Sequence, residues 1–144
     1  DASGNVTKGL PQGLTTIGTN AFYYCYALKE IEIPNSVTSI GDYCFYYAYR
    51  VTDIKLGTGL KTIGNYAFYD CYSLETISLP ESLQTIGNYA FGYCYALTGN
   101  LIIPDNVTSI GGSAFCYCSD LNGTIKIGNK VQTIYSNTFY LYSE

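Results

Sequence analysis

Apolar and polar residues alternate in short segments that recur along the chain. In LKEIEI, residues 28–33, the last four residues alternate, and VTDIKL at 51–56 and LETISL at 74–79 repeat the pattern. Alternation with a period of two predicts a β-strand with one buried face. A second, shorter extended piece is predicted at LTTI, VTSI, LKTI and LQTI, and the Pro or Gly between the two pieces marks a turn.

The dipeptide Ile-Gly divides the sequence into similar units of 23 or 24 residues. It begins at Ile17, Ile40, Ile63, Ile86 and Ile110, and a degraded sixth copy reads Ile134-Tyr135. The sequence therefore predicts six units, at about 10–32, 33–55, 56–78, 79–102, 103–126 and 127–144. Because no unit is large enough to bury its own apolar face, the units must stack into a solenoid and share one core.

After each Ile-Gly, the pattern predicts a single turn of helix. In NYAFYDCYSL, the apolar residues Ala67, Phe68 and Cys71 stand at i, i+1 and i+4, the spacing of one helical face. The recurring glycine is expected where φ is positive or where the backbone comes close to the neighbouring unit. The extra residue of the fourth and fifth units falls in LTGNLII and LNGTIKI, which we expect to bulge into solvent.

The unit resembles the BspA-like leucine-rich repeat. LKEIEI carries the L-x-x-L-x-L signature, and the unit IGNYAFYDCYSLETISLPESLQT adds Ile-Gly, Ala-Phe, Cys and a Leu-Pro turn. The resemblance extends from Leu10 to about Tyr142. It implies an α/β leucine-rich-repeat solenoid with a parallel sheet on its concave face, and a single domain over residues 1–144. We interpret the sequence as a piece of a longer protein.

The resemblance also implies a function. Members of this family are surface-exposed or secreted proteins of mucosal bacteria and some protozoa, and they are linked to adhesion to host matrix proteins or to other cells. It therefore implies a non-enzymatic binding module, extracellular or at the cell surface, with a protein ligand such as a host matrix or cell-surface protein. Two alternatives stay open: a structural spacer without a ligand, and a carbohydrate-binding surface built on tyrosines.

Composition argues against several other functions. Charged residues make up 12% of the chain and the net charge is −4, whereas nucleic-acid binding needs clustered Lys and Arg. The sequence contains no histidine, which excludes Ser-His-Asp and Cys-His activation and the commonest metal ligand. No apolar run reaches the ~18 residues of a membrane span. We expect no catalytic site, no metal, no cofactor and no membrane insertion by this segment.

Tyrosine is where this sequence departs from the family, whose slots around the cysteine are usually small. The 17 tyrosines recur in columns one unit apart. One column comprises Tyr23, Tyr46, Tyr69 and Tyr140. The candidate binding residues stand in the next two columns, Tyr24, Tyr47, Tyr93 and Tyr117, and Tyr26, Tyr49, Tyr72 and Tyr95. Tyrosine gives stiff contact area with a polar tip. The alternative is that the columns only stack and stabilise the solenoid.

A second candidate surface is the predicted concave strand face. Its residues are mixed in charge and mostly small, so they suggest no ligand class, and a plain solvated sheet is the alternative. Glu32 beside Lys55 would form a cross-strand pair of ~0.2–1 kcal/mol. The candidate residues are Glu30, Glu32, Asp53, Lys55, Ser78 and Lys126.

Four of the six cysteines occupy one position of the repeat, where the second unit has Ala48. An even number in a secreted protein would suit disulfides, and Cys71 and Cys94 in adjacent units are candidates for a bond. Because alanine fills the same slot, we favour reduced thiols that act as small buried hydrophobes.

No evident cap closes the C-terminal end, which predicts either that the native protein continues or that ends associate with one another.

Overall fold

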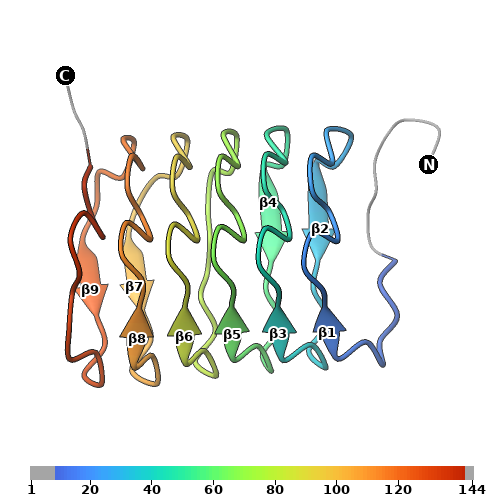
Figure 1. Ribbon diagram of the computed structural model, residues 1–144, viewed down its shortest axis with the longest axis horizontal. Coiled ribbons are helices and arrows are strands. Elements are labelled where there is room, and N and C mark those ends of the chain that lie inside the picture. Colours follow the sequence, from blue (N-terminus) through green and yellow to red (C-terminus); the bar gives the residue numbers. More distant parts are fainter. Residues whose placement is uncertain (1–8, 142–144) are drawn as a thin grey trace.

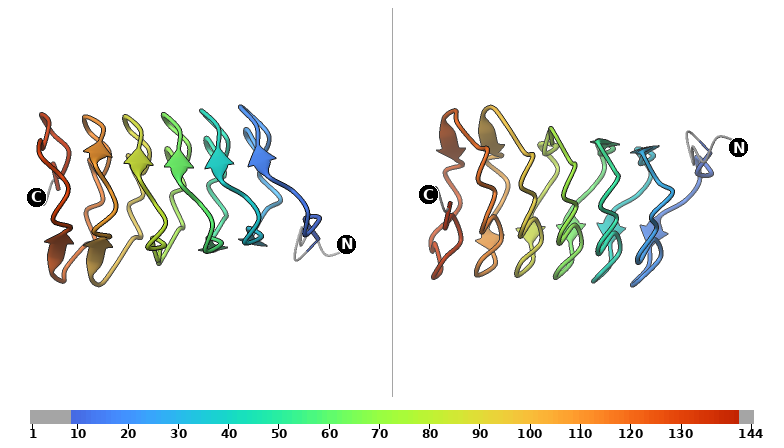
Figure 2. Two further views of the ribbon diagram at one scale, coloured as in Figure 1. Left: turned by 90° about the horizontal axis from the view of Figure 1, so that it is seen from below. Right: turned by 90° about the horizontal axis from the view of Figure 1, so that it is seen from above.

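The computed structural model describes residues 9–141, which wind into a β-solenoid of about five turns. Successive turns lie side by side along one axis, and the rod is close to straight (Figures 1 and 2). All strand pairs are parallel, with each residue paired to its counterpart in the next unit. The predicted stacking of units in sequence order is therefore confirmed over the described residues, whereas part of the last unit, 142–144, lies outside them.

The longest sheet is formed by the shorter of the two predicted extended pieces. It has five strands in the order β1-β3-β5-β6-β8. In each strand an isoleucine is buried and the hydroxyl residue before it faces outward. The strands are β1 Thr16–Ile17, β3 Ser39–Ile40, β5 Thr62–Ile63, β6 Thr85–Ile86 and β8 Ser109–Ile110.

The predicted L-x-x-L-x-L sheet is present in two separate pieces. β2 (Glu30–Glu32) pairs with β4 (Asp53–Lys55), and β7 (Leu101–Ile103) pairs with β9 (Ile125–Ile127). The third unit contributes only an isolated bridge at Thr76.

The inserted residue of the fourth unit explains the break between these two pieces. The Thr98 N–H still donates to the Glu75 carbonyl at 3.0 Å, but Gly99 then takes φ 77° and turns the chain away before β7 begins. Residues 98–100 and 122–124 are exposed, which confirms that the two insertions project into solvent.

The predicted helical turn after each Ile-Gly is wrong: the described residues contain no helix. Two residues per unit adopt left-handed backbone conformations, such as Tyr43 (φ 54°) and Tyr47 (φ 57°), and a right-handed helix cannot continue through them. Alternate N–H groups instead donate to the next unit. Phe45 donates to the Ala67 carbonyl at 2.7 Å, and Tyr47 donates to the Tyr69 carbonyl at 2.9 Å. The segment is a chain of turns joined by a further inter-unit ladder.

The glycine of the Ile-Gly pair is required by close approach to the preceding unit. A Cβ built on Gly64 would lie 2.6 Å from the Asp42 nitrogen, and one on Gly41 would lie 2.5 Å from the Thr19 nitrogen. The φ of neither residue is positive, so of the two explanations predicted, close approach is confirmed at these positions. Gly18, in the first unit, has open space at the same place.

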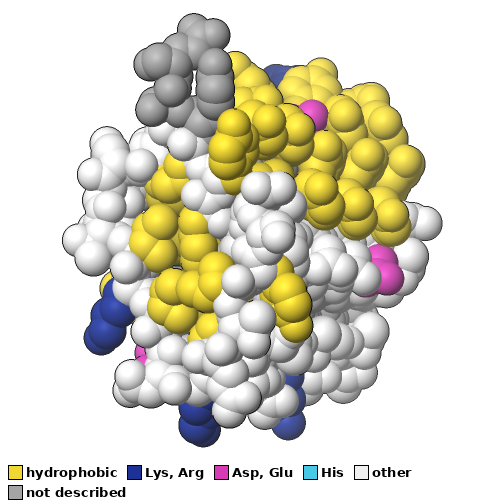
Figure 3. Space-filling model, turned by 60° about the vertical axis from the view of Figure 1, so that its left-hand side comes forward, with side chains coloured by type: hydrophobic (Ala, Val, Ile, Leu, Met, Phe, Trp, Pro, Cys, Tyr) yellow, Lys and Arg dark blue, Asp and Glu magenta, His cyan; other side chains and the backbone are white. Residues whose placement is uncertain are grey.

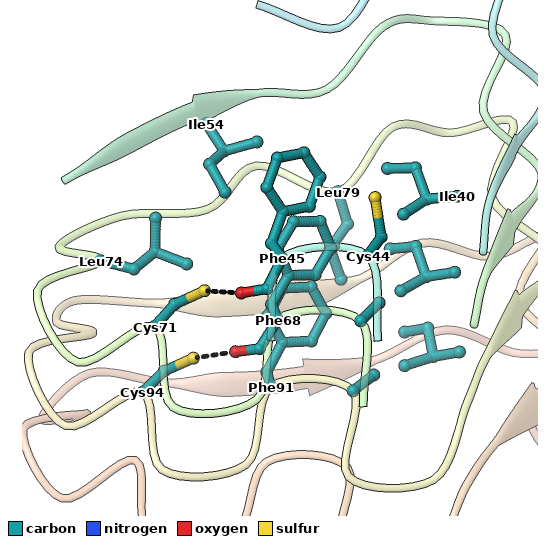
Figure 4. Close-up of a cluster of buried hydrophobic side chains, with 14 of the residues drawn as sticks. Ile40, Cys44, Phe45, Ile54, Phe68, Cys71, Leu74, Leu79, Phe91 and Cys94 are labelled. Atoms are coloured by element: carbon teal, nitrogen blue, oxygen red, sulfur yellow. Dashed lines mark hydrogen bonds between the residues drawn. The ribbon is translucent and has the colours of Figure 1, made fainter. Parts of the chain in front are cut away.

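One phenylalanine per unit forms the centre of the core (Figure 4). The rings of Phe45, Phe68 and Phe91 stack with centroids 5.1 and 4.9 Å apart and planes within 11° of parallel. Leucine and isoleucine side chains surround this column. The predicted Ala-Phe and Cys slots are buried in the central units, which confirms the predicted interior.

The cysteines are free thiols, and all but Cys25 are buried. Cys71 donates its thiol hydrogen to the Phe45 carbonyl at 3.3 Å, and Cys94 donates to the Phe68 carbonyl at 3.2 Å (Figure 4). Burial raises the pKa of the Cys44 and Cys118 thiols to about 12. These groups therefore stay protonated at neutral pH and act as small hydrophobic residues with one hydrogen bond donor.

At the C-terminal end, core side chains are less covered than in the middle of the rod. Hydrophobic surface is visible across this end in Figure 3. Ile134 is 49% exposed, and Ile127 and Val131 are only partly buried. The predicted association of ends stays a prediction.

Replacing Phe68 with alanine should lower the free energy of unfolding by about 3–5 kcal/mol, because the cavity would open in the middle of the stack. Urea denaturation of the purified chain measures this change. Tyr72→Ala is the matched control, since Tyr72 is 56% exposed and its loss leaves no cavity. A cost below about 1 kcal/mol for Phe68→Ala would contradict the stacked core.

Stability should decrease as the pH rises above about 9, because unfolded cysteines ionise there while native Cys44 and Cys118 hold their protons until about 12. The folded state then binds more protons than the unfolded state, so deprotonation favours unfolding. Urea titrations between pH 7 and 11 test this. Other units already have alanine in these two slots, so Cys44→Ala/Cys118→Ala is the matched variant. Its free energy of unfolding should decrease less steeply with pH, and a slope identical to that of the native chain would contradict the prediction.

Candidate functional site: an aromatic face

The segment after each glycine corner places tyrosines on one side of the rod. In the second unit, Cys44, Phe45 and Ala48 point into the core, and the residues between and beside them are tyrosines that face outward or along the surface. Figure 3 shows the result as a continuous patch of hydrophobic side chains. The tyrosine face consists of Tyr23, Tyr24, Tyr26, Tyr43, Tyr46, Tyr47, Tyr49, Tyr66, Tyr69, Tyr72, Tyr89, Tyr93, Tyr95, Tyr117 and Tyr140.

Two columns of this face stack almost perfectly parallel. Tyr46 lies 5.2 Å from both Tyr23 and Tyr69, with interplanar angles of 5° and 12°. The second column, Tyr43, Tyr66 and Tyr89, has spacings of 5.0 Å and angles of 1° and 8°. This second column was not among the predicted tyrosine columns, although its signal in the sequence is plain: tyrosine recurs every 23 residues, two positions before the core phenylalanine.

The candidate binding tyrosines form the two remaining columns. In one, Tyr24 stacks on Tyr47 at 5.1 Å and Tyr93 stacks on Tyr117 at 4.6 Å. In the other, the rings are tilted: Tyr26 and Tyr49 meet at 50°, and Tyr72 and Tyr95 meet at 55°. The structure thus brings all eight predicted residues onto one face.

Asp70 interrupts one of these columns between Tyr47 and Tyr93. The Tyr47 hydroxyl forms a hydrogen bond with the Asp70 carboxylate. Burial raises the pKa of this carboxyl, and the hydrogen bond from Tyr47 partly offsets the effect. Asp70 therefore gives the tyrosine face an acidic, partly buried acceptor at its centre.

The stacking determines which parts of the tyrosines a partner can touch. In the two parallel columns, ring faces lie against the neighbouring rings, so these columns present mainly ring edges and hydroxyl groups. Burial is the main cause that raises the pKa of Tyr46 and Tyr93, and the neighbouring tyrosines raise it further. The hydroxyls are therefore protonated at neutral pH and can both donate and accept hydrogen bonds.

The stack ends in the fifth unit, where a hollow opens. Its volume is about 490 Å³, within the range of about 300–1,000 Å³ typical of small-ligand sites. Tyr89 and Tyr93 of the fourth unit line it together with Tyr117 of the fifth unit and with Asn137 and Tyr140 of the sixth unit. Ser113 and Cys116 of the fifth unit line it where other units have tyrosine.

The predicted strand-face residues are only partly brought together. Glu30 lies opposite Asp53, and Glu32 lies opposite Lys55, in the pairing of β2 with β4. These four residues line a small depression with Ile31. Ser78 is exposed but lies outside the strands, and Lys126 belongs to the separate sheet of β7 and β9. Because the rod is close to straight, this side is not a pronounced concave surface (Figure 2).

Within residues 9–141, no three Cys, Asp or Glu side chains are grouped so that they could hold a metal ion. The same residues contain no helix long and apolar enough to cross a bilayer.

Seven tyrosines adopt left-handed backbone conformations, which disfavour residues with a Cβ by about 1–2 kcal/mol each. Tyr66→Gly removes this conformational cost but also loses the contacts with the two neighbouring rings. Tyr66→Ala keeps the cost and loses the same ring contacts. We expect both variants to be less stable than the native chain, and alanine to be worse than glycine by about 1 kcal/mol. Thermal and urea unfolding measure the order. In ordinary strands and helices alanine is more stabilising than glycine. If Tyr66→Ala were more stable than Tyr66→Gly, the prediction would be contradicted.

A family model described as "BspA type Leucine rich repeat region" matches residues 15–143 with six copies. A leucine-rich repeat protein of T. pallidum is 32% identical with a TM-score of 0.74, over 83% of this chain and 62% of its own. One from Bacteroides ovatus is 32% identical with a TM-score of 0.76, over 84% and 33%. The chain thus spans less than two thirds of either protein, and no curated protein matches it. It belongs to the BspA-type leucine-rich repeat family.

Proposed function

We propose that this chain is a non-enzymatic protein-binding module that contacts its partner through the tyrosine face. Leucine-rich repeats form scaffolds that often bind proteins, and such repeats are generally non-enzymatic. The observation that carries the proposal is the exposure of stacked aromatic side chains: Tyr23, Tyr26 and Tyr49 are each at least 44% exposed. A monomer rarely exposes a large contiguous aromatic patch without a binding role.

The rigidity of the tyrosine face supports this proposal. Each ring has only two side-chain torsions, and neighbouring rings about 5 Å away restrict them further. The inter-unit hydrogen bonds fix the backbone beneath the rings. A partner would therefore bind a surface that is already ordered, and it would lose little side-chain entropy on association.

The polar chemistry of the tyrosine face also favours a protein partner. Asp70 provides one acceptor among uncharged hydroxyls, which suits a partner surface with hydrogen bond donors and an apolar centre. The strand side offers a different surface, where Glu30 lies opposite Asp53 in a mixed-charge cluster. We therefore place the partner on the tyrosine face and treat the strand side as the comparison surface.

The two alternative functions make different use of the same stacks. A spacer needs only the stacking energy, about 0.5–1.5 kcal/mol per ring pair beyond burial, and gives no role to exposed ring edges. A carbohydrate surface needs open ring faces, but in the two parallel columns most ring faces lie against other rings. Display on a cell surface or secretion belongs to the proposal, because it places the face within reach of host matrix or cell-surface proteins.

Binding of the purified chain to a panel of isolated extracellular-matrix proteins, measured by surface plasmon resonance, tests the proposal. At least one matrix protein should bind, and Tyr49→Ser/Tyr72→Ser should weaken it by tenfold or more, since interface tyrosines often contribute over 1 kcal/mol each. Neither residue has a left-handed backbone, so the melting temperature should change little.

Lys55→Ser/Lys126→Ser is the matched control on the strand side and should keep the native affinity. Equal losses for the two double variants would remove the tyrosine face as the site. No binding to any matrix protein would favour the spacer function.

A further inference from the structure

The two parallel tyrosine stacks are interrupted next to each other, one from the fourth unit onward and the other in the fifth unit. The column of Tyr43, Tyr66 and Tyr89 continues as Ser113 in the fifth unit. The column that contains Tyr69 continues as glycine and then as Cys116. Small side chains thus replace two neighbouring rings, and the hollow opens at this place.

The backbone at the interruption keeps the geometry of the units before it. Ser113 has φ 57°, compared with 56° at Tyr66 and 52° at Tyr89. Its N–H donates to the Ser136 carbonyl of the next unit, as the Tyr66 N–H donates to the Asn88 carbonyl. Ser113 therefore occupies a tyrosine position of the column without a ring, and it lines the hollow there.

The interruption leaves one face of Tyr89 without a stacked ring. Its ring contacts are with Tyr66 at 5.0 Å and with Tyr69 at 6.1 Å, both in the third unit. Within residues 9–141, no ring of the fifth unit stacks on it. Elsewhere in this column the corresponding face is covered by the next tyrosine.

The lining of the hollow indicates the chemistry of its occupant. It carries no charged residue; Tyr93, Tyr117 and Tyr140 supply aromatic rings, and Asn137 supplies an amide group. Cys116 is buried at the place of the second missing ring, and a sulfur beside an aromatic edge is favourable. An uncharged flat ring with one polar substituent matches this arrangement.

We propose that the hollow binds an aromatic side chain, foremost a tyrosine, of the partner protein. The ring stacks on the open face of Tyr89 and takes the place that the fifth unit's own tyrosine would fill. This inference rests on the proposed function, since it names the group by which a protein partner is anchored. One buried aromatic anchor surrounded by hydroxyl-rich contacts is the usual arrangement of a binding hot spot.

The proposal is tested with N-acetyl-L-tyrosinamide as the probe and amide chemical shifts of the ¹⁵N-labelled chain as the readout. The probe should shift the amide signals of Ser113 and Cys116 in a saturable manner. N-acetyl-L-leucinamide should shift them at least fivefold less at equal concentration. Methyl β-glucoside is the sugar probe, and shifts as large as those of the tyrosine probe would overturn the assignment to an aromatic side chain.

Ser113→Tyr is the decisive variant, because it supplies the missing ring at a position whose backbone already matches Tyr66. It should fold, raise the melting temperature and weaken probe binding at least tenfold. Ser119→Tyr is the matched control: it adds a tyrosine to the same unit at an exposed position that does not line the hollow, and it should leave probe binding unchanged. Should Ser113→Tyr fail to fold, Tyr89→Leu removes the stacking face and should weaken binding equally.

Two results would overturn the inference: no saturable shift at the solubility limit of the probe, or an unchanged affinity in folded Ser113→Tyr. Because the probe is a small molecule, this outcome does not depend on finding the matrix partner. A partner that binds native chain and Ser113→Tyr alike would leave the proposed function standing and remove only the anchor. Loss of partner and probe binding together in Ser113→Tyr supports both.

Discussion

The position of every side-chain column depends on backbone hydrogen bonds between equivalent residues of successive units. The Gly41 N–H donates to the Ile17 carbonyl at 2.8 Å, and the Phe45 N–H donates to the Ala67 carbonyl at 2.7 Å. These bonds fix the register so that isoleucine lies beside isoleucine and phenylalanine lies on phenylalanine. Tyrosines outside the core inherit the same register, and they stack because the backbone leaves them about 5 Å apart.

Stacking also explains how tyrosine is tolerated at unusual backbone positions. Left-handed conformations ordinarily favour glycine, asparagine or aspartate, and Asn20, Asp70 and Asn137 occupy them at three places. Where tyrosine stands instead, stacking on at least one ring of a neighbouring unit offsets the conformational cost. The tyrosine face therefore depends on the stacking of several units. An isolated unit would have the same unfavourable backbone conformations but no ring contacts to offset their cost.

The sequence was sufficient to predict the period, the stacked units, the buried Ala-Phe and Cys slots and the exposed insertions, because each is a matter of spacing between apolar residues. It was not sufficient for the turn segment. Ala67, Phe68 and Cys71 share one face in a helix, but they also share one in a chain of turns, and only the φ angles of Tyr66 and Asp70 separate the two. The split sheet depended on how Gly99 redirects the chain. The hollow required knowing that Ser113 keeps the backbone of a tyrosine position.

The direction of the inter-unit hydrogen bonds has a consequence for the electrostatics of the rod. Along the turn segment, donors such as Tyr43, Phe45 and Tyr47 point toward the next unit, whereas Thr38 and Gly41 point back toward the previous one. The peptide dipoles of the two sides are therefore opposed, unlike those of an α-helix, where they add along the axis. Lengthening the rod therefore accumulates little axial field, because each added unit contributes opposed peptide dipoles on its two sides.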